Sequence, residues 1–100
     1  MITVGLIVRV EAKPDKVSEV EAMLASVVDR VREEGLAVVW FGLRLSPTTF
    51  AIFDAFTSEA DRDAHLKANG DALRAAGAQL FSEPPSIEYV DVVAAKLPGE

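Results

Sequence analysis

The segment 2-ITVGLIVRVEA-12 has the composition of a β-strand, and it is apolar on both of its faces. β-Branched residues dominate the segment, and it ends in charge. One face carries Ile2, Val4, Leu6, Val8 and Val10, and the opposite face carries Thr3, Gly5 and Ile7. A strand that is apolar on both faces is normally covered on both. Helices of the same chain can cover one face, so the sequence predicts that something else covers the second.

A long amphipathic helix is predicted after this strand. Apolar side chains recur at three- and four-residue steps in the stretch 14–35 (Val17, Val20, Leu24, Val27, Val28 and Val31), which is typical of a helix packed on a sheet. Pro14 and Asp15 suit its first turn, and Gly35 suits its end.

The rest of the chain is predicted to form three more strands and a second helix. Segments 36–45 and 49–57 are predicted strands, and the short turn Ser46-Pro47-Thr48 makes them an antiparallel hairpin. Ser58 is expected to cap a second helix, with Asp61 three residues later. Asn69-Gly70 is expected to break or bend that helix, so that a short helical piece at 71–76 follows, and 87–95 is the last strand.

The order β-α-β-β-α-β predicts one domain that spans residues 1–100. One antiparallel sheet with both helices on one face is the economical solution, which is a ferredoxin-like sandwich of the α+β class. This arrangement leaves an apolar sheet face bare, and an exposed patch of that size usually marks an interface. We therefore predict a homodimer in which two sheets pack face to face.

Charge and composition exclude several classes of function. The formal net charge is −6, with 16 acidic against 10 basic residues, so neither nucleic acid nor an anionic membrane surface is an expected partner. The chain has no cysteine, which removes disulfides, thiolate nucleophiles and cysteine-based metal sites. No segment approaches the ~20 apolar residues of a membrane span. The N-terminus lacks the features of a signal peptide, and we expect a cytoplasmic protein.

The stretch 50-FAIFDAF-56 places one acid, Asp54, on an otherwise apolar strand face. Burial of a carboxylate costs several kcal/mol unless the group is paired or hydrogen-bonded, so Asp54 is expected either in a solvated cavity or beside a partner. The single histidine of the chain, His65, follows about two helical turns later and can fold back over the same face. A hydrogen bond between them would raise the imidazole pKa and fix its tautomer.

Two interpretations of this pair stay open. His65 is either a core histidine that satisfies one buried acid, or a general base or donor that lines a ligand cavity. The aromatic side chains Trp40, Phe56, Phe81 and Tyr89 are candidate walls of such a cavity, or members of the core. Asn69 is either a donor within the cavity or a turn and cap residue. One histidine cannot build a multi-histidine site, and no metal site is predicted.

Three motifs together resemble the antibiotic biosynthesis monooxygenase family: A-K-P-D-K-V-S-E-V after the first strand, E-E-G at the end of the first helix, and F-A-I-F-D-A-F-T-S-E-A-D-R-D-A-H-L. The similarity covers about residues 2–94. It implies a dimeric α+β barrel and, in characterised members, oxygenation of quinol-type or polycyclic aromatic substrates. Some members use no metal, flavin or haem, because the electron-rich substrate anion itself reduces dioxygen.

The resemblance gives a first hypothesis and two rivals. The first is a cofactor-independent monooxygenase with His65 as base or donor and Asp54 as its orienting partner. The rivals are a non-catalytic small-molecule-binding or stress-related homodimer, and a scaffold whose only role is association. The related haem-degrading enzymes are excluded, because residues 2–12 contain no asparagine and Phe56 stands where they need tryptophan. The E-P-G that is usual in the family is Glu33-Glu34-Gly35 in this chain, and this departure is not expected to matter to the chemistry.

Overall fold

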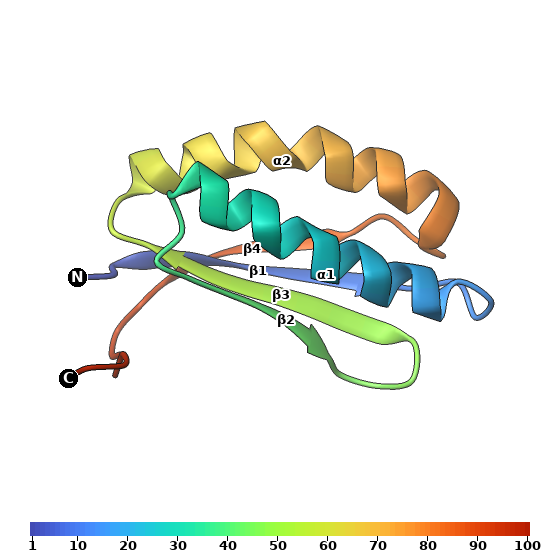
Figure 1. Cartoon of the computed structure of the whole chain (residues 1–100), viewed down its shortest axis with the longest axis horizontal. Helices are drawn as coiled ribbons and strands as arrows, with labels where there is room; N and C mark the ends of the chain where they lie inside the picture. Colours follow the sequence, from blue (N-terminus) through green and yellow to red (C-terminus); the bar gives the residue numbers. More distant parts are fainter.

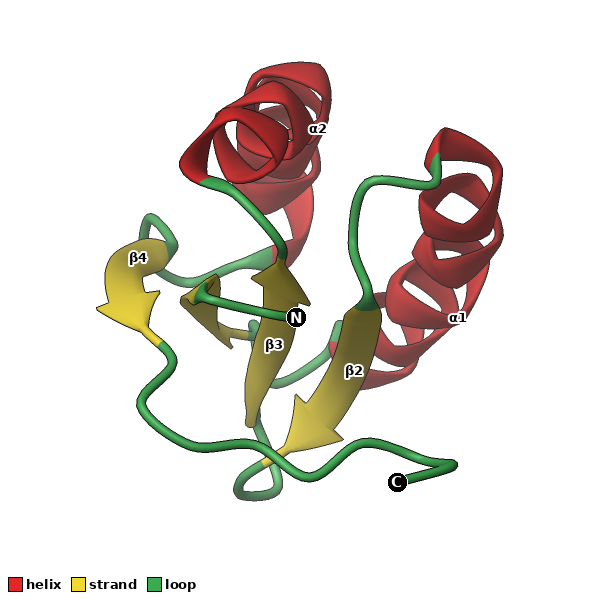
Figure 2. Cartoon of the chain, turned by 90° about the vertical axis from the view of Figure 1, so that its left-hand side faces the viewer, coloured by secondary structure: helices red, strands yellow, loops and turns green.

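Two helices lie on one side of a four-stranded sheet, and the C-terminal segment passes along the other side (Figure 1, Figure 2). The computed structural model describes residues 1–100. Its elements are β1 (Val4–Glu11), α1 (Val17–Glu34), β2 (Val39–Arg44), β3 (Thr49–Phe56), α2 (Glu59–Leu80) and β4 (Ser86–Asp91). The predicted βαββαβ succession and the ferredoxin-like α+β fold are therefore confirmed. No helix is both long and apolar enough to cross a membrane.

The sheet has the strand order β2-β3-β1-β4, and every neighbouring pair is antiparallel. Leu6 of β1 lies opposite Asp54 of β3 and Tyr89 of β4, and Asp54 lies opposite Trp40 of β2. Residues that lie opposite one another share a sheet face. These four side chains therefore form one row across the face that the helices cover, with the acid between two apolar neighbours.

Helix α1 begins at Val17, later than predicted, because Pro14 and Asp15 form the turn that precedes it. Its apolar stripe faces the sheet, and Val20 and Leu24 join the main core. It ends as predicted at Gly35, which adopts a left-handed conformation with φ of 71° and donates its N–H to Val31 O at 3.1 Å. Glycine suits this position because it adopts a positive φ without steric cost.

Helix α2 is continuous from Glu59 to Leu80, so the predicted break at Asn69-Gly70 is wrong. The Asn69 side chain donates to His65 O at 2.8 Å and to Glu34 of the other helix at 2.9 Å, which ties it into the structure. A helical glycine costs only ~1 kcal/mol relative to alanine, and tertiary contacts offset that cost. The predicted cap is confirmed, because Ser58 Oγ accepts a hydrogen bond from the Asp61 N–H at 3.1 Å.

The main core lies between the sheet and the N-terminal half of α1. Val8 and Phe50 of the sheet pack there with Val20 and Leu24 of α1. Phe81, directly after α2, completes this core and is 4% exposed. The last strand ends at Asp91, earlier than the predicted 95, and the following residues leave the sheet.

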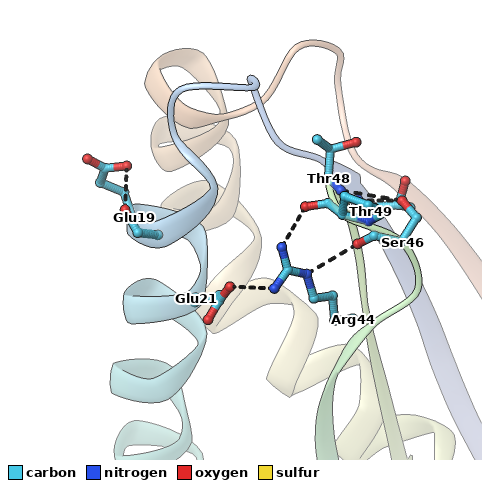
Figure 3. A network of polar contacts seen from close by, with 8 residues as sticks. Glu19, Glu21, Arg44, Ser46, Thr48 and Thr49 are labelled. Atoms are coloured by element: carbon cyan, nitrogen blue, oxygen red, sulfur yellow. Dashed lines mark hydrogen bonds and ion pairs between the residues drawn. The ribbon is translucent and has the colours of Figure 1, made fainter.

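An ion-pair network anchors the β2–β3 turn to α1 (Figure 3). The guanidinium of Arg44 lies 3.1 Å from Oε1 of Glu21 and donates to the carbonyls of Ser46 and Pro47 at 3.3 and 2.8 Å. Ser46 Oγ also accepts from the N–H groups of Thr48 and Thr49. These bonds satisfy the polar backbone of a tight turn and fix β2 relative to α1.

The sheet face away from the helices exposes apolar side chains. Ile7, Phe53 and Phe41 lie opposite one another in register, and Leu43 is on the same face. Phe41 is 54% exposed and Leu43 is 42% exposed, although β-strand side chains of this kind are normally covered. This is the bare face that the sequence predicted.

Candidate functional site

Asp54 lies near the end of β3 and is only 2% exposed. The strand places it on the helix-covered face, and α2 passes over that face directly after the turn at Ser58. A buried carboxylate in an apolar row needs a compensating partner.

His65 of α2 supplies that partner. Its Nε2 lies 3.1 Å from Oδ2 of Asp54, and the histidine is 6% exposed. The pairing expected from the sequence is therefore present. The imidazole also packs on the ring of Phe56, with 5.2 Å between the ring centroids.

A second carboxylate binds the other side of the same imidazole. Oε1 of Glu34, the last residue of α1, lies 2.5 Å from Nδ1 of His65. Asn69 supports the carboxylate, because its Nδ2 donates to Glu34 Oε2 at 2.9 Å and to His65 O at 2.8 Å. The side chains of Glu34, His65, Asp54 and Asn69 thus form one chain of contacts that links both helices to the sheet; we call it the acid–histidine cluster.

The cluster favours the protonated imidazole. An ionised carboxylate only accepts hydrogen bonds, so two carboxylates on one ring require that both ring nitrogens donate. Burial by itself would lower the pKa of His65, but the hydrogen bonds and charges of Asp54 and Glu34 outweigh it, and the net effect raises the pKa above its ordinary 6.5. The protonated form of His65 is therefore favoured, and in that form neither ring nitrogen has a free lone pair.

A cavity of about 480 Å³ adjoins the cluster between the two helices and the sheet. Asp54, His65 and Asn69, which are joined by hydrogen bonds, form what we call its polar end. Ser26 and Arg30 also line the cavity, and most of its wall is aliphatic, including Leu24, Ile52 and Leu73. A concave, mostly apolar space with a few convergent polar groups is the usual form of a small-molecule site.

The structure separates the predicted site residues into two groups. Trp40, Asn69, Asp54 and His65 all line this cavity. Phe56 is fully buried and packs with Val4 and Leu6 beside His65.

Phe81 and Tyr89 lie elsewhere. Phe81 follows the last residue of α2, sixteen residues after His65, and belongs to the main core. Tyr89 lies on the edge strand β4, where it is 57% exposed and its ring lies 4.8 Å from the Arg62 guanidinium carbon. Neither side chain lines the cavity. Tyr89 instead lies beside Asp63, Lys67 and Arg74 of α2, in a different hollow.

Glu34 is the site residue that the sequence analysis left without a role. It lies 31 positions before His65, so no local spacing joins the two residues. The one available signal was its place directly before Gly35, where an acid is unfavourable next to the negative end of the helix dipole. An acid at a helix C-terminus suggests a positively charged partner from another element.

The described side chains include no group of three potential ligands arranged for a metal ion.

Comparison with known proteins supports the fold. A protein of unknown function from Nitrosomonas europaea is 44% identical, with a TM-score of 0.93, over 100% of this chain and 98% of its own. A proposed antibiotic biosynthesis monooxygenase from the same organism is 20% identical, with a TM-score of 0.79, over 91% of this chain and 90% of that chain. A third structure, of an antibiotic biosynthesis monooxygenase, is 17% identical, with a TM-score of 0.75, over 91% of this chain and 99% of that one.

The two monooxygenase structures share the fold of this chain, and the resemblance predicted from the sequence is confirmed at that level. No protein-family model matches the sequence. No curated protein is significantly similar to it.

Proposed function

We propose, from the premise that this chain belongs to the same family as the Nitrosomonas europaea protein of unknown function, that its cavity binds a hydroxylated aromatic molecule and that the protein oxygenates it. The observation that carries this proposal is the buried Asp54–His65 pair at the polar end of an apolar cavity of about 480 Å³. The fold shared with antibiotic biosynthesis monooxygenases supports the same reaction class.

The proposed reaction begins with transfer of a proton from a quinol hydroxyl to the carboxylate of Asp54, because both nitrogens of His65 already contact carboxylates. The resulting anion is electron-rich and transfers electrons to dioxygen without a bound cofactor. One oxygen atom enters the ring as a new hydroxyl, the other leaves as water, and the quinol becomes a hydroxyquinone. The substrate supplies all four electrons, so the balance needs no external reductant. The protein contributes proton removal, orientation and the exclusion of water.

Two copies of the chain are part of the proposal. The bare sheet face around Phe41 and Leu43 is apolar, and a second copy packed on it would bury these side chains. Such a dimer would leave the cavity of each chain on the helix side of its own sheet.

Oxygen uptake with a panel of hydroquinones tests the reaction. We expect uptake above the protein-free autoxidation rate, with one dioxygen consumed for each quinol. Asp54→Asn is expected to reduce the rate by roughly 10²–10⁴-fold, the range for loss of a general acid or base. Asp63→Asn changes an exposed acid on α2; it is the matched control and should leave the rate unchanged.

A wild-type rate equal to autoxidation on every quinol would refute the oxygenase proposal. The second candidate function is binding of aromatic molecules without turnover. It is favoured by one observation, that both nitrogens of His65 already bind carboxylates, so the ring offers no free base. Saturable binding in the absence of oxygen uptake would support this second function.

A further inference from the structure

Only one of the two carboxylate oxygens of Asp54 has a partner within the protein. Its Oδ2 lies against His65, but Oδ1 is buried and has no hydrogen-bond partner among the protein atoms. A buried acceptor without a partner costs about 1–3 kcal/mol, and more when the group is charged. Asp54 also lines the cavity, so a molecule in the cavity is the natural source of the missing donor.

The other polar side chains on the cavity wall already have partners, except Arg30, which is exposed and can only donate a hydrogen bond. His65 contacts a carboxylate on each ring nitrogen. The Asn69 amide donates to Glu34 and to the His65 carbonyl, which uses both of its N–H bonds. Ser26, which lines the cavity from α1, donates to Met23 O.

We infer that Asp54 Oδ1 is the anchor of the site, and that the cavity selects aromatic molecules that present a hydroxyl donor to it. In this arrangement His65 is a positioning residue: it holds the carboxylate by Oδ2 and does not touch the ligand hydroxyl. The inference rests on the cavity assigned under the proposed function. The feature of the ligand that this cavity recognises is a hydroxyl donor.

Acceptor-only ligands are expected to bind less well. A methyl ether presents oxygen lone pairs to a carboxylate oxygen and leaves Oδ1 buried without a donor. A hydrogen bond to a charged group contributes about 1.5–3 kcal/mol, which corresponds to roughly a 10–100-fold difference in affinity. The apolar wall contacts of the two ligands are otherwise alike.

Equilibrium dialysis under nitrogen with 2-naphthol and 2-methoxynaphthalene tests this selection. Wild-type protein is expected to bind the naphthol roughly 10–100-fold more tightly than the ether. In Asp54→Asn the amide oxygen can keep the contact with His65, so the amide N–H₂ replaces Oδ1. That variant should lose the preference for the naphthol or reverse it.

Leu73→Ala is the control variant, because Leu73 lines the same cavity and carries no polar group. It should weaken both ligands alike and leave their ratio unchanged. Equal affinity of wild type for both ligands, a preference that survives in Asp54→Asn, or no binding of either ligand would each overturn the inference.

The binding test and the oxygen-uptake test can contradict the two proposals independently. A preference for the naphthol without oxygen uptake would leave the anchor in place and remove the oxygenase function. Uptake of oxygen without the preference would retain the function and remove Asp54 Oδ1 as the anchor.

Discussion

Nδ1 of His65 lies 2.5 Å from Oε1 of Glu34, and this contact joins the end of α1 to the second turn of α2. The same ring contacts Asp54 of β3 through Nε2. One histidine ring therefore links two helices and the sheet at the polar end of the cavity. The protonation state of His65 therefore affects its hydrogen bonds with both carboxylates.

The titration of His65 should report its carboxylate neighbours directly. Because the chain has one histidine, a single Cε1–H proton resonance can be followed with pH. We expect a midpoint above 6.5 in the wild type, since Asp54 and Glu34 raise the pKa of His65 against the effect of burial.

Glu34→Gln should move that midpoint down, because one of the two negative charges is removed while the shape is kept. Glu33→Gln is the matched control: Glu33 is the exposed neighbour and should leave the midpoint in place. Equal midpoints in wild type and Glu34→Gln would show that Glu34 does not raise the pKa of His65 in solution.

The pH dependence of stability follows from the same shift. The pKa of His65 is raised in the folded state, so the folded chain binds a proton that the unfolded chain releases at about pH 6.5. The stabilisation is fully present below that pH and is lost as pH rises through the folded pKa. Denaturant unfolding at a series of pH values should show the free energy of unfolding falling over this interval, and falling less in Glu34→Gln. Parallel curves for the two proteins would contradict the linkage.

Two glycines of α2 should respond in opposite ways to the same substitution. A Cβ on Gly77 would lie 2.7 Å from Cδ2 of Phe81, a ring that is buried in the core and has little room to move. Gly77→Ala is therefore expected to destabilise the fold by about 1–3 kcal/mol through overpacking.

Gly70→Ala places its Cβ 3.5 Å from the flexible end of Arg74, which is an ordinary contact. It should stabilise the protein by up to ~1 kcal/mol through better helix propensity. Thermal and denaturant unfolding of both variants measures the two effects. Stabilisation by both substitutions would show that the Phe81 ring can move aside.

The bare sheet face should determine the oligomeric state. Phe41→Asp puts a charge on the apolar face and is expected to shift the protein from a dimer to a single 10.7 kDa chain in sedimentation. Ala78→Asp, an exposed substitution on α2, introduces the same charge on the helix side and should leave the dimer intact. A monomeric wild type would rule out the face-to-face packing.

Much of the fold could be predicted because its signals are local. The stripe from Val17 to Val31, the cap at Ser58 and the turn at Ser46 each act within a few residues, and each is present in the structure. The Asp54–His65 pair was also accessible, because one acid on an apolar strand face needs a partner and the single histidine follows closely.

Other features were decided only by tertiary structure. Glu34 reaches His65 because the end of α1 lies beside the beginning of α2 in the fold (Figure 1). The spacing of the two residues in the sequence gives no sign of this contact. The continuity of α2 through Asn69-Gly70 depends on bonds to another helix, which outweigh the local preference of these residues for turns. Tyr89 shares a strand face with Asp54, yet it lies in a different hollow and does not line the cavity. The sequence alone determined the order of strands and helices, the sheet faces and the need for a partner at Asp54. Packing decided which side chains meet, since contacts between distant segments depend on how the helices cross the sheet.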